Sequence, residues 1–331
     1  MFENTFFYLS IILINLYITL KFSKISLFRI NIDYPSSKRN IHKKPVASTG
    51  GLLIILNILL LFIYLILLKK ESIDYFFFLG CFMVFTLGFL DDKYNLSYNN
   101  KFILLSLIFS FCFFLDKNLR IEQLYLESVN KTVNINNFSF FLTIFCLLLF
   151  SNALNMFDGI NCQCIIFCII LFSYLLTLQN QLLIFFLILI FIFLSYLNTK
   201  NLIFLGNSGS YLASFIISHQ IIYFYNSKII KSIEEIFILL MIPGIDMLRV
   251  FLHRLYNKKN PFKADKNHLH HFLLSRYGYK STITLLSLIL VITYLILYLG
   301  VSKIIIIFSY SLFYIILISY LYSQKKIRDL I

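Results

Sequence analysis

The sequence is poor in charge. Only 13% of its 331 residues are Asp, Glu, Lys or Arg, whereas 60% are hydrophobic. A soluble domain of this size carries roughly a quarter charged residues, so the composition excludes a soluble globular protein and indicates an integral membrane protein. Tryptophan is absent as well, and we draw no function from that absence.

Two further absences narrow the class of protein. The N-terminus, MFENTFFYLS, has no basic region before its apolar run and no small-residue cleavage site, so we expect no cleaved signal peptide. The six cysteines lie in or at the edge of apolar segments. We therefore expect no disulfides, and we expect Cys162 and Cys164 to be small core residues rather than a metal-binding pair.

Long apolar runs dominate the chain. A helix needs about 20 apolar residues to cross the hydrocarbon of a bilayer, and runs of that length or slightly less predict an all-α polytopic bundle of about 11 transmembrane helices. Two runs are short, so ten spans is the alternative. No internal repeat and no soluble domain is found, so we expect one membrane domain over 1–331. The runs lie at about 5–20, 50–68, 75–90, 102–115, 138–153, 162–178, 182–197, 209–225, 236–249, 282–299 and 304–321.

Lysine and arginine concentrate in alternate loops. One set, which includes 21–49, 250–281 and the tail 322–331, holds 20 of the 29 basic residues, and the opposite set holds 8. Basic loops stay in the cytoplasm, so we expect an inner-membrane protein with its N-terminus outside and its C-terminus inside. This distribution accounts for most of the net charge of +14, so we expect no nucleic-acid partner.

Five unusual polar stretches all fall on the predicted cytoplasmic face, whereas the opposite loops hold scattered polar residues. This one-sidedness indicates a functional site at that face. The stretches are RNIHKKPVASTGG (39–51), FLDDKYNLS (89–97), NALNMFDGIN (152–161), IFLGNSGSY (203–211) and ADKNHLHHF (264–272).

Acids and amides fill the second and third stretches. Asp91 and Asp92 end a span, where a solvated pair is the ordinary alternative, but adjacent acids favour a nearby cation. Asn152, Asn155 and Asp158 are spaced i, i+3, i+6, which places them in a slanting ridge on one side of a helix. Such a ridge suits a base, a sugar or a metal, and a polar helix C-terminus is the alternative.

The fourth stretch has a glycine on each side of Asn207-Ser208, just before an apolar helix. Glycine lets the backbone approach a ligand closely, and a helix N-terminus suits a phosphate or another anion. A plain N-cap is the alternative.

Three histidines, His268, His270 and His271, fall in the fifth stretch among Lys and Arg. The H-x-H-H spacing is not the i, i+4 pair of a helical zinc site, so we expect these residues to meet anions, with zinc as the alternative. His219, inside an apolar run, is expected to be a packing residue. Asp246 and Arg249, at i and i+3, are expected to pair.

At these motifs the chain resembles the polyprenyl-phosphate sugar-1-phosphate transferases, the family of undecaprenyl-phosphate N-acetylglucosamine-1-phosphate transferase and phospho-N-acetylmuramoyl-pentapeptide transferase. The resemblance runs from about 35 to 280. The matching motifs are H-x-x-P…G-G (His42, Pro45, Gly50, Gly51), the Asp91-Asp92 pair, N-x-x-N-x-x-D-G (Asn152 to Gly159), F-L-G-x-S-G-S and N-H-L-H-H.

The resemblance implies a magnesium-dependent transfer of an amino-sugar 1-phosphate from a UDP-N-acetylhexosamine to undecaprenyl phosphate, which begins the synthesis of a cell-surface polysaccharide such as lipopolysaccharide. It assigns Asp91, Asp92 and Asp158 to catalysis, with Asp91 or Asp92 as a base or as a metal-binding residue. Asn207, Asp158 and Asp91 would hold the metal. Substrate binding would fall to His42, Thr49, Gly50, Asn152, Asn155, Asn161, His268, His270 and His271. A homodimer is a further expectation.

The chain departs from the family pattern at three places. Asn207 replaces an Asp that is a metal ligand in the family, Asn161 replaces a second Asp, and Ser48-Thr49 stand where an Arg often precedes G-G. An inactive or altered-metal paralogue is therefore one alternative. A polytopic transporter is another, although it would be expected to carry charges at mid-span. A non-catalytic scaffold gives no reason for five polar stretches on one face.

Overall fold

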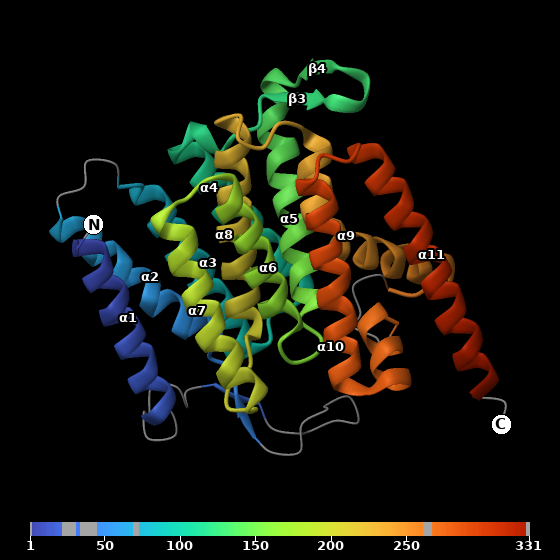
Figure 1. The fold of residues 1–331 in the computed structure, drawn as a ribbon, viewed down its shortest axis with the longest axis horizontal. Helices are drawn as coiled ribbons and strands as arrows, with labels where there is room; N and C mark the ends of the chain where they lie inside the picture. The colour runs from blue at the N-terminus through green and yellow to red at the C-terminus, as the bar shows by residue number, and fades with distance from the viewer. Residues whose placement is uncertain (1, 22–30, 34–44, 69–72, 261–266, 329–331) are drawn as a thin grey trace. The chain divides into compact units, whose positions relative to one another are not determined.

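The computed structural model describes residues 2–21, 31–33, 45–68, 73–260 and 267–328 (Figure 1). Within these residues the chain forms eleven α-helices, two short antiparallel strand pairs and three single-turn 3₁₀ segments. The helices are α1 (Phe2–Lys21), α2 (Gly50–Leu67), α3 (Tyr75–Tyr94), α4 (Tyr98–Leu115), α5 (Ser139–Phe157), α6 (Gln163–Leu178), α7 (Leu182–Thr199), α8 (Gly206–Asn226), α9 (Ile233–Tyr256), α10 (Leu269–Tyr298) and α11 (Lys303–Arg328). The strands are β1 (Ile32–Asp33), β2 (Val46–Ala47), β3 (Gln123–Leu126) and β4 (Lys131–Asn134), and β1 pairs with β2 and β3 with β4.

Each of the eleven predicted apolar runs coincides with one helix, so the prediction of an all-α, multi-pass membrane protein is confirmed. Eight of the described helices are long and apolar enough to cross a bilayer, namely α2–α5, α7 and α9–α11. The remaining three are shorter or more polar: α6 has 16 residues, and α8 begins with Gly-Asn-Ser-Gly-Ser. The orientation predicted from Lys and Arg stays a prediction.

Contacts divide the chain into two compact units. The first comprises Met1–Arg120 and Phe140–Tyr223, and the second Ile121–Ser139 and Phe224–Ile331. In the first unit α8 is the most enclosed helix, because Leu212, Ala213, Ile216 and Ile217 are all fully buried. The prediction of one polytopic domain stays a prediction.

A buried amide pair joins α1 to α2 in the first unit. The Asn15 side chain donates to Asn57 Oδ1 at 2.7 Å, and the Asn57 side chain donates back to Asn15 Oδ1 at 3.2 Å. Both residues are buried. Because each amide satisfies the other, the two apolar helices are fixed in one register.

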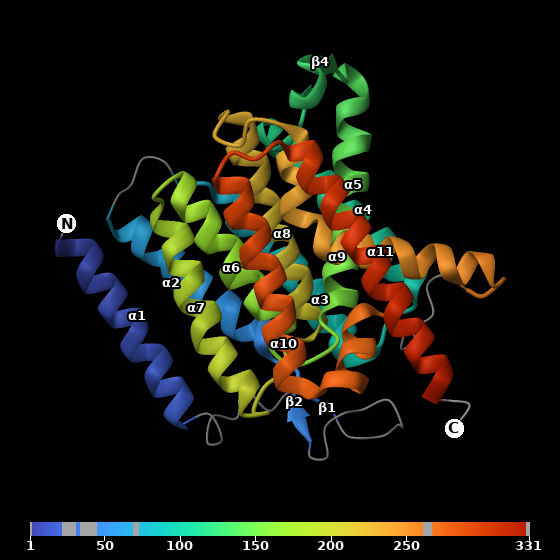
Figure 2. The same cartoon turned by 45° about the vertical axis from the view of Figure 1, so that its right-hand side comes forward.

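In the second unit, the β3–β4 hairpin is held to α9 by the Glu234 carboxylate. That carboxylate accepts hydrogen bonds from the backbone amides of Glu127 and Ser128 at 3.2 and 3.0 Å. Helix α10 changes direction at Gly278, whose φ is +76°, so a short helix carries the histidines and a long one follows (Figure 2). The predicted run 282–299 is the long part.

Apolar side chains cover the outer face of α11 at helical spacing. Ile305, Phe308, Leu312 and Ile315 are each about 60–70% exposed, and in water such a stripe would be costly. The stripe therefore fits a helix that faces lipid.

Candidate active site

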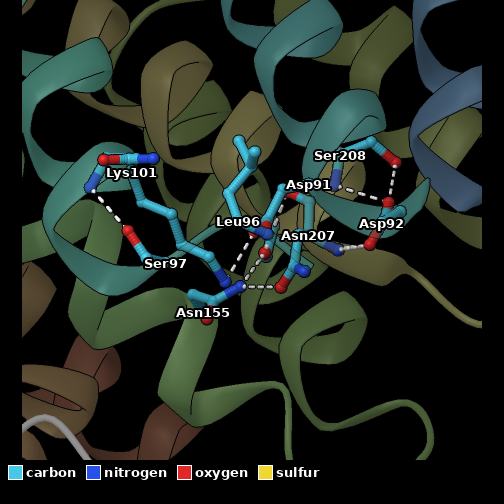
Figure 3. A network of polar contacts seen from close by, with 10 residues as sticks. Asp91, Asp92, Leu96, Ser97, Lys101, Asn155, Asn207 and Ser208 are labelled. Carbon is cyan, nitrogen blue, oxygen red and sulfur yellow. Dashed lines mark hydrogen bonds and ion pairs between the residues drawn. The ribbon is translucent and has the colours of Figure 1, made fainter. Parts of the chain in front are cut away.

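Asp92, at the end of α3, caps the start of α8. Its carboxylate accepts hydrogen bonds from the backbone amides of Asn207 at 2.7 Å and Ser208 at 3.0 Å, and from Ser208 Oγ at 2.7 Å (Figure 3). Gly206 has φ +73°, and a Cβ there would lie 2.8 Å from Asp92 Oδ2. The helix N-terminus that we expected to meet a phosphate thus holds an anion of the chain itself.

Asp91 is fully buried and turns the chain from α3 into α4. Its Oδ1 accepts from the Leu96 amide at 3.0 Å, and Lys101 Nζ lies 2.8 Å from its Oδ2. The Asp91 charge is therefore neutralised inside the protein. Lys101 was not singled out by the sequence, because a lysine early in a helix on the predicted basic face is ordinary.

Asn155, near the end of α5, joins α5 to the same end of α8. Its Nδ2 donates to Asn207 Oδ1 at 2.7 Å and to Ser210 Oγ at 2.8 Å, so its own amide oxygen is directed away from these two bonds. Figure 3 shows the Asn155 and Asn207 side chains pointing toward one another. Of the predicted ridge, Asn152 instead donates to Leu148 O in its own helix.

Asp158 follows α5 and differs from the other two acids. Within the described part of the chain its carboxylate accepts no hydrogen bond and has no ion-pair partner, and the side chain is half-buried. Burial first, and then the nearby Asp92 carboxylate, raises the pKa of Asp158 to about 7. A carboxylate in that position would be stabilised by a cation.

The G-G motif packs against the start of α8. The Gly50 amide donates to Phe204 O at 2.9 Å, and a Cβ on Gly51 would lie 2.6 Å from the Gly209 backbone nitrogen. This contact gives both glycines a packing role. Thr49 is buried directly before them, and the predicted residue His42 lies outside the described residues.

Asn161 lies in the turn after Asp158 and bonds to the end of α7. Its amide donates to Asn201 Oδ1 at 2.6 Å. Beside it, the Cys162 amide donates to Asn198 Oδ1 at 2.6 Å, and Asn198 Nδ2 donates to Ile203 O at 2.7 Å. The buried Asn198 thus ties the Asp158 turn to the loop before α8, a role that its place at the end of an apolar run does not reveal.

The histidine stretch forms its own network in the second unit. Asp246 accepts from the Leu269 amide at 3.0 Å and lies 2.8 Å from His268 Nδ1. Arg249 donates to Asp246 at 2.9 Å, which confirms the predicted pair, and Tyr314 donates to the same carboxylate at 2.7 Å.

The three histidines stand together at the start of α10. The His268 and His270 rings stack with centroids 5.5 Å apart, and the His270 and His271 centroids are 4.3 Å apart. His268 and His270 are buried. The structure therefore brings these three residues into one cluster anchored by Asp246.

The donor atoms around Asp158 suit a hard cation. Among the described residues the Asp158 carboxylate has no partner, and Asn155 and Asn207 carry amide oxygens; both are ligand types that Mg²⁺ accepts. Asp91, which the sequence also placed in the metal set, has Lys101 as its partner. Among the described residues, a separate group with metal-ligand spacing lies at the other end of α3, formed by Asp74, Asp116 and His219.

Comparisons with known proteins address the same segment. Residues 75–225, which run from α3 through α8, match the family model described as glycosyl transferase family 4. This match covers just under half of the chain. Together with the relatives below, it indicates a membrane-bound transferase of the polyprenyl-phosphate sugar-phosphate type, as the motifs predicted.

Two curated relatives support the assignment. A protein of Bacillus subtilis named probable undecaprenyl-phosphate N-acetylglucosaminyl 1-phosphate transferase is 25% identical over 271 residues, which are 78% of this chain and 74% of the relative. A Thermotoga maritima protein named undecaprenyl-phosphate alpha-N-acetylglucosaminyl 1-phosphate transferase is 28% identical over 216 residues, which are 63% of this chain and 65% of that relative.

Proposed function

We propose that the protein transfers an amino-sugar 1-phosphate from a UDP-N-acetylhexosamine to undecaprenyl phosphate, with Mg²⁺, at the cytoplasmic face of the inner membrane. The product lipid would begin the synthesis of a cell-surface polysaccharide. The names of both relatives specify undecaprenyl phosphate and an N-acetylglucosaminyl 1-phosphate group, which supports this lipid acceptor and this class of sugar.

Asp158, whose carboxylate has no partner in the part of the chain that the structure describes, carries the proposal. Of the other two acids, Asp91 pairs with Lys101, and Asp92 accepts hydrogen bonds from the start of α8. Asp158 is thus the acid of this group that remains available to a cation or to a substrate hydroxyl. We assign Asp158 as the main protein ligand of Mg²⁺, with the amide oxygen of Asn155 beside it.

In the reaction, an oxygen of the lipid phosphate attacks the β-phosphorus of the nucleotide sugar, the bond to the α-phosphate oxygen breaks, and UMP leaves. Bound Mg²⁺ would offset the charge of the phosphate groups. The second pKa of a phosphate monoester is about 6, so most of the nucleophile is already deprotonated at neutral pH. We therefore assign no proton transfer to Asp91 or Asp92.

The chain's own residues orient the site. Asp92 fixes the first turn of α8, and α8 holds Asn207 against Asn155. In the second unit, Asp246 and Arg249 orient the histidine cluster, whose nitrogen donors suit phosphate oxygens. We assign His268, His270 and His271 to the diphosphate on this basis.

The test is UMP release by the purified protein in detergent, with undecaprenyl phosphate, a panel of UDP-N-acetylhexosamines, and Mg²⁺ added or chelated. We expect release that needs lipid, one or more donors, and Mg²⁺. Asp158→Asn, which keeps the shape and removes the charge, should abolish release. Asp33→Asn, at an exposed position of β1, is the matched control. Release by Asp158→Asn at the wild-type rate would contradict the assignment.

The altered-metal alternative has a specific observation behind it, because Asn207 Oδ1 is already engaged by Asn155. If the wild-type chain releases no UMP with any donor and Asn207→Asp does, the native metal site is inactive. If neither the wild type nor Asn207→Asp releases UMP, the donor is a sugar nucleotide outside the panel.

A further inference from the structure

A second polar cluster lies at the opposite end of α3 from Asp91 and Asp92. It combines Asp74, which precedes α3, Asp116, which follows α4, and His219 of α8. One ligand atom of each lies within 4.8 Å of the others. From residue 74 to residue 92, at about 1.5 Å per residue, α3 separates this cluster from Asp92 by about 27 Å.

His219 packs among apolar side chains, as its apolar run predicted, and it also faces Asp74. Its side chain is 6% exposed, and the ring lies against Phe77 and Phe215, with centroids 4.6 and 6.1 Å away. Its Nε2 lies 3.1 Å from Asp74 Oδ2, yet among the described residues it makes no hydrogen bond of standard geometry. The contact with Asp74 directs Nε2 into the cluster rather than into the apolar packing.

Backbone amides orient both carboxylates. Asp74 Oδ1 accepts from the Phe77 amide at 2.9 Å, and Asp116 Oδ1 accepts from the Asn118 amide at 2.9 Å. Each acid therefore has one oxygen fixed by its own turn, and the second oxygen of Asp74 faces His219. Two carboxylates this close together carry a negative charge that a cation would offset.

The His219 ring has a neighbour that can fix its tautomer. Nδ1 lies 3.4 Å from the amide nitrogen, Nε2, of Gln220. The amide nitrogen at that place donates to Nδ1, which leaves the ring proton on Nε2, toward Asp74, and a bound cation would take the place of that proton.

We propose that Asp74, Asp116 and His219 bind a divalent cation of the zinc type, separate from the metal of the transferase reaction. One imidazole nitrogen and two carboxylate oxygens, with water in the remaining position, form a ligand set that Zn²⁺ accepts. Mg²⁺ prefers oxygen ligands alone, so zinc should bind better here. This inference does not rest on the proposed function.

The bound cation would tie three helices at one end. Helices α3 and α8 are the two that Asp92 joins at the other end through the Asn207 and Ser208 amides. A cation at this cluster would therefore hold the far ends of the helices that position Asn207, and its first effect would be on stability rather than on chemistry.

The experiment uses the full chain, stripped with a chelator in detergent and then exposed separately to Zn²⁺ and Mg²⁺. We expect about one zinc per chain by elemental analysis and a higher unfolding temperature with Zn²⁺ than with Mg²⁺. His219→Gln and Asp116→Asn should each weaken zinc binding at least roughly tenfold. His253→Gln and Asp33→Asn are the matched controls.

Three results would overturn the proposal: no zinc retained by the wild type, equal zinc affinity in the site variants and the controls, or a stronger response to Mg²⁺ than to Zn²⁺. Asp116 is only half-buried, so Asp116→Asn keeps the test decisive if His219→Gln fails to fold.

Discussion

Replacing Asp92 by Asn separates a capping role from a role in the chemistry. The Asp92 carboxylate accepts three hydrogen bonds at the start of α8, two of them from backbone amides. In Asp92→Asn, one amide oxygen remains and an NH₂ group faces a donor. Hydrogen bonds to a charged group contribute about 1.5–3 kcal/mol each, and an anion at a helix N-terminus adds about 0.3–1 kcal/mol. We expect a loss of about 2–4 kcal/mol of stability, since one of the oxygen contacts survives.

The assay can use the chain's own cysteines. Five of the six are buried, so a thiol-reactive dye reports unfolding, and circular dichroism reports loss of helix. Ser208→Ala removes one bond to Asp92 and leaves both backbone amides, so it should cost only about 1 kcal/mol. The reasoning fails if Asp92→Asn unfolds at the wild-type temperature while its UMP release disappears, because Asp92 would then act on substrate or metal directly.

Three further predictions concern the same unit. Gly51→Ala should prevent folding or lower the unfolding temperature sharply, because the new Cβ would lie 2.6 Å from the Gly209 backbone nitrogen. Expression level and dye-monitored thermal unfolding measure this effect, and an unfolding temperature equal to that of the wild type would refute it. Asn207→Asp should lower the Mg²⁺ concentration needed for half-maximal UMP release, because Asn155 can still donate to the new carboxylate while a charge is added; an unchanged titration would remove this position from the metal site. In metal-free protein, the pKa of Asp158 is about 7 in the folded state and about 4 in the unfolded state. The folded state therefore binds this proton more tightly, and stability should fall as pH rises between these values. Asp158→Asn should remove that pH dependence of stability, and an equal pH dependence in both proteins would refute the assignment.

The helices could be predicted because their signal is local. Each apolar run became a helix, and the differences lie at the ends, where polar residues extend the helix past the apolar stretch. Helix α4 begins at Tyr98 because the Ser97 side chain accepts from the Asn100 amide. Helix α10 begins at Leu269, before the apolar run, because the histidine segment is itself helical up to Gly278.

The partners of the site residues could not be predicted from spacing. The i, i+3 pattern correctly grouped Asn152 and Asn155 on one helix, but it does not say what faces each of them. Asp92 and Asn207 are 115 residues apart. Each lies in a different motif, and the sequence suggested a cation site for the first and an anion-binding helix start for the second. Only the fold reveals that the acid of one motif occupies the helix terminus of the other.

This pairing changes how the replacement of an Asp by Asn207 should be weighed. Counted along the sequence, the site has lost an acid that would hold Mg²⁺. In the structure, however, Lys101 neutralises Asp91 and the start of α8 stabilises Asp92, so Asp158 is the one acid of the three left to offset a dication. Mg²⁺ in phosphate-transfer sites is commonly held by one or two carboxylates together with substrate phosphates. A dication held by Asp158 alone would keep more of its positive charge for the phosphate groups of the two proposed substrates, which repel each other. On this argument Asn207 weakens metal binding in the absence of substrate more than it weakens catalysis, since the substrate phosphates complete the coordination.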